Sequence, residues 1–228
     1  MQEHFTGEIE SLKTSLLKMA SLVDEQVEKA ITALQTGNIE LLKGIKGKDN
    51  EVDAYENLIH TQCENVLALF QPVATDLRFV LSTLMINTQL ERCGDIAVNV
   101  AQRVKKTHEF HTLIEESKIL DMATEARGMV KDAIDSFVNL NTELAGKVLD
   151  RDEIVDKLNK TIFKFLVAKM QKDPSLIEPG SQMIVLSRNL ERLADHATNI
   201  AEELVFYVNA EIIAHSKRRE KEKTDDGN

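Results

Sequence analysis

Apolar residues recur at steps of three and four along most of the 228-residue chain, which is the spacing of one face of an α-helix. Gly37-Asn38, Gln71-Pro72 and the polar run THEFH at 107–111 interrupt this pattern. The uninterrupted stretches are 8–36, about 39–70, about 73–106, 119–137, about 150–170 and a last one that ends near 215. The pattern therefore predicts an all-α protein built from six long helices.

Three segments depart from the regular pattern. Gly44 and Gly47 predict an irregular start to the second helix, because glycine is a poor helix former. Residues 171–181 hold two of the three prolines and predict a loop or a short helical turn. Residues 216–228 are charged and aperiodic, so we expect a disordered tail there.

One twelve-residue segment occurs twice, one hundred residues apart. Residues 90–101 read LERCGDIAVNVA and residues 190–201 read LERLADHATNIA, with seven identities. The helices before this segment also repeat, at an offset of 103, as Val52 does in Val155. Such a repeat indicates one supersecondary unit used twice. We expect two three-helix bundles of antiparallel neighbours and a tail, over residues 1–108, 109–215 and 216–228.

Composition narrows the functional class. The net charge is -10, from 28 Lys and Arg against 38 Asp and Glu, which argues against a nucleic-acid partner. No run approaches the ~18 apolar residues of a membrane span, and the N-terminus has no apolar signal region. Two cysteines make no disulfide framework, and Cys63 and Cys93 both lie on apolar stripes. We expect a soluble, cytoplasmic protein with no membrane span.

Pairs of acidic residues four apart stand out among the polar positions, because this spacing puts both carboxylates on one helix face. They are Asp49/Asp53, Glu91/Asp95, Asp152/Asp156 and Glu191/Asp195. In an antiparallel hairpin, residues equally far from the turn lie level. A turn at Pro72 brings the first two pairs level, and a turn at Asp173-Pro174 does the same for the other two. We call these sets the first acidic patch (Asp49, Asp53, Glu91, Asp95) and the second acidic patch (Asp152, Asp156, Glu191, Asp195).

The carboxylates of each patch repel one another. Two such charges ~5 Å apart repel by about 3 kcal/mol at an effective dielectric near 20, so four together need raised pKa values or a bound cation. Oxygen ligands without thiolates favour Mg, Ca, Mn or iron over structural zinc. Asn99, Asn199 and His196, on the same helices, are additional and weaker candidate ligands. We therefore predict a metal site on each patch.

Simpler interpretations compete with a metal site. Acidic pairs are common on solvated helix faces, and Arg92, Arg192 or Lys48 could neutralise these. His108 and His111 lie three apart in a connector and are ordinary surface residues there. In the blandest interpretation, the chain is a plain helical scaffold whose acids keep it soluble.

A carboxylate-bridged metalloenzyme of the ferritin-like type is the alternative function. That architecture uses a Glu-x-x-His pair on each of two helices. None of the six histidines here has a glutamate three residues before it. The chain also lacks a Gly-rich phosphate loop and a nucleophile elbow. We therefore predict no catalytic residues and a protein that is not an enzyme.

The runs ERCGD and ERLADHATNIAE resemble the twin signatures of the PhoU family of phosphate-uptake regulators. QPVATDLRF at 71–79 is similar to that family's other characteristic run, whereas the second half has QKDPSLIEPGS instead. The resemblance implies two tandem three-helix bundles with pseudo-twofold symmetry. It also implies multinuclear surface clusters of iron or another divalent ion, with Fe, Mn, Zn and Mg not distinguished, held by the acidic pairs.

The resemblance carries a functional expectation that the residues alone do not. It implies a regulator that restrains high-affinity phosphate uptake and the phosphate-starvation response. Its expected partners are the ATPase subunit of the phosphate transporter and the phosphate-sensing histidine kinase. The expected assembly is a homodimer.

Overall fold

The computed structural model describes residues 2–210, which form an all-α fold. Within them are six long helices: α1 (Gln2–Thr36), α2 (Ile45–Phe70), α3 (Ala74–Thr107), α5 (Ile119–Val138), α6 (Thr142–Lys172) and α7 (Ile177–Asn209). The shorter elements are η1 (Ile39–Leu42), η2 (His108–Phe110), α4 (His111–Glu116) and η3 (Pro174–Leu176). The prediction of six long helices is confirmed. No helix in the described part is long and apolar enough to cross a membrane.

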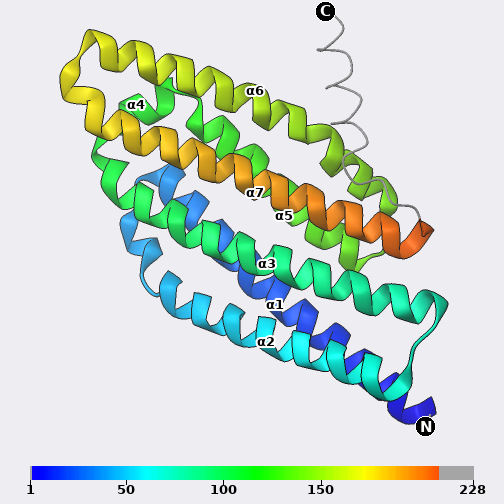
Figure 1. The fold of residues 1–228 in the computed structure, drawn as a ribbon. Coiled ribbons are helices and arrows are strands. Elements are labelled where there is room, and N and C mark those ends of the chain that lie inside the picture. The colour runs from blue at the N-terminus through cyan, green and yellow to red at the C-terminus, as the bar shows by residue number, and fades with distance from the viewer. Residues whose placement is uncertain (1, 211–228) are drawn as a thin grey trace, which may run out of the picture.

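The helices form two three-helix bundles that meet along α3 and α7 (Figure 1). In the view of Figure 1, α6 lies at one edge of the molecule and α2 at the other. Arg103 Nη1 donates to Gln182 Oε1 (2.6 Å), and Ser82 Oγ donates to the carbonyl of Glu203 (3.4 Å). The two hydrogen bonds join equivalent positions, since 203 and 182 follow 103 and 82 by one hundred residues. This exchange of partners is the mark of a pseudo-twofold axis between α3 and α7.

Aliphatic side chains fill the interior. Leu16, Ile59, Leu90 and Leu190 are among the fully buried side chains. Both cysteines are buried free thiols, and burial raises the pKa of each to about 12. They serve as small apolar side chains.

Local signals place the helix boundaries. Asn38 Oδ1 accepts from the amide of Glu40 at the start of η1, and Gly44 adopts a left-handed conformation (φ 78°) before α2. The irregular start predicted for the second helix is therefore confirmed. Asn141 caps α6 by accepting from the amide of Leu144 (3.0 Å). This helix starts eight residues earlier than predicted, and Gly146 lies inside it because one interior glycine costs only about 1 kcal/mol.

Two connections are more helical than the sequence predicts. The expected polar connector at 107–111 continues into α4, where Leu113 and Ile114 are buried. The last helix begins at Ile177, inside the segment 171–181 for which the sequence predicts a loop or a short turn, because proline is tolerated in a first helical turn, where Pro179 lies. The predicted end near 215 and the predicted tail at 216–228 lie outside the described residues.

A matched pair of leucine truncations tests the packing. Leu190 is fully buried in α7, whereas Leu17 in α1 is 42% exposed. We expect Leu190→Ala to lower the free energy of unfolding by ~2–5 kcal/mol, because it leaves a cavity in the core. Leu17→Ala should change it by about 1 kcal/mol or less. Urea unfolding followed by circular dichroism measures both, and equal losses would contradict this core.

Candidate metal centre

The antiparallel packing of α2 on α3 assembles the first acidic patch. Asn87 Nδ2 in α3 donates to the carbonyl of Glu56 in α2 (3.0 Å), which agrees with the register expected from a turn at Pro72. Burial raises the pKa of Asp49, and the neighbouring charges of Asp53 and Asp95 raise it further. The two helices therefore bring acids from both pairs within electrostatic reach of one another.

Glu91 is the most perturbed carboxylate of this patch. Its side chain is only 14% exposed, and burial together with the charge of Asp95 raises its pKa to about 7. Its Oε2 is buried without a hydrogen-bond partner, although Arg92 Nε lies 3.3 Å away and partly offsets the shift. Arg92 Nη1 also lies 3.4 Å from Asp95 Oδ2. Glu91 is therefore poised to accept a proton or a cation near neutral pH.

A third helix contributes a residue that the sequence analysis missed. Gln26 of α1 is fully buried behind Asp49. Its Nε2 donates to the carbonyl of Ile45 (3.3 Å) and, at 3.5 Å, to Asp49 Oδ1, while its Oε1 has no partner. The sequence offers one signal for Gln26, which is a polar residue directly before Val27 on the apolar stripe of the first helix.

Lys48 does not neutralise the first patch through a hydrogen bond to it. Lys48 instead pairs with Glu25 of α1, which also binds Lys29 at 2.7 Å. These two hydrogen bonds lower the pKa of Glu25 to about 2. The ion pair joins α1 to the first turn of α2, beside Asp49.

The second acidic patch is built on α6 and α7, with different surroundings. Arg151 stands where the first half has Lys48, and its Nη1 lies 2.7 Å from Asp132 Oδ2 of α5. Its Nη2 lies 2.9 Å from Glu125 Oε2, also on α5. All four acids of this patch are partly buried.

The weaker candidate ligands of the second half point to the seam between the bundles. His196 Nδ1 lies 2.7 Å from Gln89 Oε1 of α3, and Asn199 Nδ2 donates to the same oxygen (3.1 Å). Burial and the charges of Arg192 and Arg92 lower the pKa of His196 to about 4. The imidazole is therefore neutral at pH 7 and joins α7 to α3. Asn99, on the first signature, is partly buried.

Within residues 2–210, no three Asp, Glu, His or Cys side chains are gathered closely enough to hold a metal ion. The acids of the first patch lie within electrostatic reach of one another without converging on one point. The connector histidines are engaged locally, with His108 Nδ1 3.0 Å from the carbonyl of Lys105 and His111 Nε2 3.4 Å from Glu115 Oε1.

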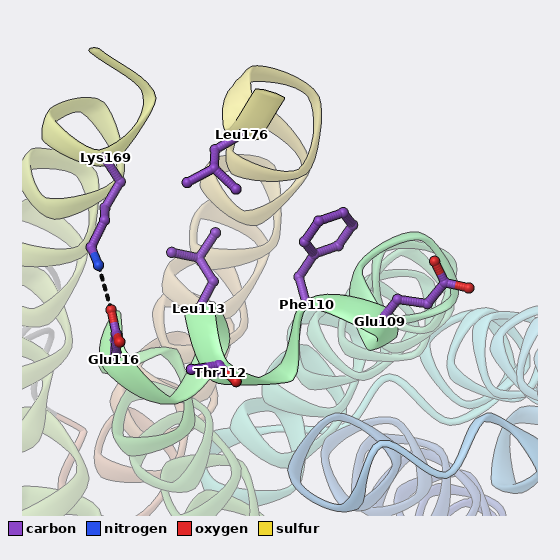
Figure 2. Close-up of a pocket in the computed structure, with 7 residues that line it drawn as sticks. All are labelled: Glu109, Phe110, Thr112, Leu113, Glu116, Lys169 and Leu176. Atoms are coloured by element: carbon purple, nitrogen blue, oxygen red, sulfur yellow. Dashed lines mark hydrogen bonds and ion pairs between the residues drawn. The ribbon is translucent and has the colours of Figure 1, made fainter. Parts of the chain in front are cut away.

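An open hollow of about 300 Å³ lies at the connector between the bundles (Figure 2). Its lining residues are Glu109, Phe110, Thr112, Leu113, Glu116, Lys169 and Leu176. Lys169 Nζ reaches Glu116 Oε2 at 2.5 Å, so the one lining lysine is already paired. No residue of either acidic patch lines this hollow.

Glu91 gives the free protein a predicted pH dependence. The folded-state pKa is about 7 against an ordinary 4.5, so the folded protein holds a proton that the unfolded chain loses as pH rises between these values. The free energy of unfolding therefore falls as the pH rises over that range. In buffer that contains a metal chelator, the free energy of unfolding of Glu91→Gln should exceed that of wild type by about 1–2 kcal/mol at pH 8. The two values should be equal near pH 4. Urea unfolding at both pH values measures the difference, and a pH-independent difference would contradict the assignment.

Comparison of this chain with known proteins identifies its family. The PhoU domain pattern matches residues 16–104 and 119–204, one match in each bundle. A phosphate-specific transport system accessory protein PhoU homolog from Aquifex aeolicus is 36% identical over 214 residues, covering 94% of this chain and 97% of that protein. The homolog from Pseudomonas putida is 32% identical and covers 94% of this chain and 84% of that protein.

Solved structures give the same result. The crystal structure of PhoU from Pseudomonas aeruginosa superposes with a TM-score of 0.83 at 32% identity, covering 91% of this chain and all of that one. A phosphate transport system regulatory protein PhoU from Streptococcus pneumoniae gives 0.81 at 31% identity, covering 92% and 99%. These names describe accessory and regulatory proteins, in agreement with the expectation that the chain is not an enzyme. With both repeats matched and relatives similar over nearly its whole length, the chain belongs to the PhoU family.

Proposed function

We propose that this protein restrains high-affinity phosphate uptake and the phosphate-starvation response through metal-loaded acidic patches on its surface. The observation that carries the regulatory part is similarity over more than nine-tenths of the chain to phosphate-specific transport system accessory proteins. The duplicated acidic pairs carry the metal part. A regulator of this kind acts by binding, which suits a fold whose distinctive polar residues lie on helix faces.

The donor set of the first patch fits a hard divalent cation or iron. Four carboxylates offer only oxygen ligands, and the buried Glu91 Oε2 has no hydrogen-bond partner. In this proposal Asp49, Asp53, Glu91 and Asp95 hold the ion by rotating their side chains towards it. A bound ion supplies a fixed positive charge on an acidic surface, and this charge favours the ionised form of Glu91, whose pKa is raised by burial and by the charge of Asp95.

The second patch holds its ions in the corresponding way, through Asp152, Asp156, Glu191 and Asp195. In this proposal His196 and Asn199 join α7 to α3, because both hydrogen-bond to Gln89. The two patches are therefore expected to present carboxylate-bound metal on each half of the molecule.

The proposed partners are the ATPase subunit of the phosphate transporter and the phosphate-sensing histidine kinase. Both parts of such a system are reached from the cytoplasm, where we place this protein, acting as a homodimer. Metal on the acidic patches would let a surface of net negative charge bind acidic or phosphorylated groups of a partner.

Elemental analysis of purified protein tests the metal part. After mild dialysis without chelator, wild type should carry several equivalents of a transition metal, and the Asp95→Ala/Asp195→Ala variant should carry little. An Asp76→Ala/Asp121→Ala variant, which removes an acid from the first turn of α3 and one from that of α5, should match wild type. Equal and negligible metal in all three proteins would make the patches solvated faces.

Partner capture tests the regulatory part. Immobilised wild-type protein should retain the purified ATPase subunit, and the Asp95→Ala/Asp195→Ala variant should retain at least about tenfold less if the metal contributes to contact. Failure of the wild-type protein to bind both the ATPase and the kinase would contradict the proposed regulation, whatever its metal content.

A further inference from the structure

The short helix α4, which follows α3, covers the connection between α6 and α7 in the other bundle. Leu113 and Ile114 of α4 are buried, and Glu116 Oε2 accepts from Lys169 Nζ of α6 (2.5 Å). Leu113 also lines the hollow together with Leu176, which belongs to the α6–α7 connection. Figure 2 shows these two leucine side chains pointing towards one another. An element from the end of the first bundle therefore shields an apolar residue of the second.

The sequence of α4 is repeated after α7. At an offset of 99, HTLIEESK at 111–118 aligns with AEIIAHSK at 210–217. Isoleucine, serine and lysine are identical in the two runs, at Ile114 and Ile213, Ser117 and Ser216, and Lys118 and Lys217. The buried Leu113 corresponds to Ile212. The duplication of the chain therefore extends past the last described helix, and the residues that α4 buries have apolar counterparts there.

The C-terminal end of α7 lies beside the connection between α2 and α3 (Figure 1). Arg78 Nε near the start of α3 donates to the carbonyl of Tyr207 (3.3 Å), and the rings of Phe79 and Tyr207 lie 5.6 Å apart. The pseudo-twofold axis relates this arrangement to the end of α3 beside the α6–α7 connection. Seven residues span at most ~25 Å when extended, so residues 211–217 have the length to cross the α2–α3 connection.

That connection carries an uncovered apolar surface. Val73, before α3, is 73% exposed, and Leu69, in the last turn of α2, is 72% exposed. These are the two most exposed large apolar side chains in the described part of the chain. At an offset of 103, Val73 corresponds to Leu176, which faces Leu113 of α4 in the other half. We call Leu69 and Val73 the connection surface, and exposed apolar surfaces of this kind are typical of contact sites.

We propose that residues 211–217 of this chain dock on the connection surface, with Ile212 against Val73 as Leu113 faces Leu176. Each bundle then has one connection covered by a segment that comes from the other bundle. Docking removes Leu69 and Val73 from water, and release of the segment exposes them again. The proposal goes beyond the regulatory function and depends neither on bound metal nor on a partner protein.

Amide hydrogen exchange of the full-length chain tests whether the segment covers the connection. Ile212→Asp/Ile213→Asp puts two charges into the apolar part of the segment and should release it from the connection surface. We expect the amides of residues 67–77 to exchange at least about fivefold faster in this variant than in wild type. Thr224→Asp/Gly227→Asp is the matched control, because it adds the same charge beyond residue 217, and it should leave these rates unchanged. Equal rates in all three proteins, or equal acceleration in both variants, would overturn the proposal.

A disulfide between introduced cysteines identifies the occupant of the surface. Val73→Cys/Ile212→Cys protein should form a disulfide within one chain under mild oxidation, detected by peptide mapping and by a non-reducing gel. Both native cysteines are buried, so the introduced pair reacts without them. A disulfide that joins two chains would place the segment of a second copy on the surface and overturn docking within one chain. Absence of any disulfide would also overturn it.

Val185→Cys/Ile212→Cys is the matched control for the disulfide. Val185 is also an exposed valine, but it lies on α7 about 36 Å before Asn209 at 1.5 Å per residue. Three further residues cannot span that distance back, so this pair should form no disulfide within one chain. Circular dichroism melting checks that each variant is folded, and the cysteine pair decides the question if the aspartate pair is not.

Discussion

The antiparallel packing of α3 against α7 is the interaction on which the rest of the structure depends. Hydrogen bonds that exchange partners span this seam, from Arg103 with Gln182 to Ser82 with Glu203. Each of these helices also closes its own three-helix bundle and carries one acidic pair. Packing the two signature helices on each other therefore fixes both the pseudo-twofold relation of the halves and the placement of the two acidic patches.

Much of this organisation could be predicted from the sequence, because it depends on local signals. Apolar spacing located the six long helices, and the turn at Pro72 set the register that Asn87 and Glu56 confirm. The repeated polar residues indicated a unit used twice, which the two domain matches confirm. Mutual repulsion of Asp49, Asp53 and Asp95 in the folded protein follows from the same hairpin geometry.

Two of the features that could not be predicted depend on contacts between elements far apart in the chain, and a third depends on a local capping bond. Gln26 reaches Asp49 from α1, a third helix that lies outside the hairpin of α2 and α3. His196 lies next to Asp195 in sequence, yet its ring turns to Gln89 in the other bundle. The early start of α6 depends on the Asn141 cap, which outweighs the cost of Gly146 inside the helix. In each case a tertiary contact or a capping bond decided between local alternatives.

The most direct test of the account is anomalous diffraction from crystals of the full chain grown with Mn²⁺. We expect a manganese peak at each acidic patch. Ordered peaks on neither patch, in crystals saturated with Mn²⁺, would contradict it.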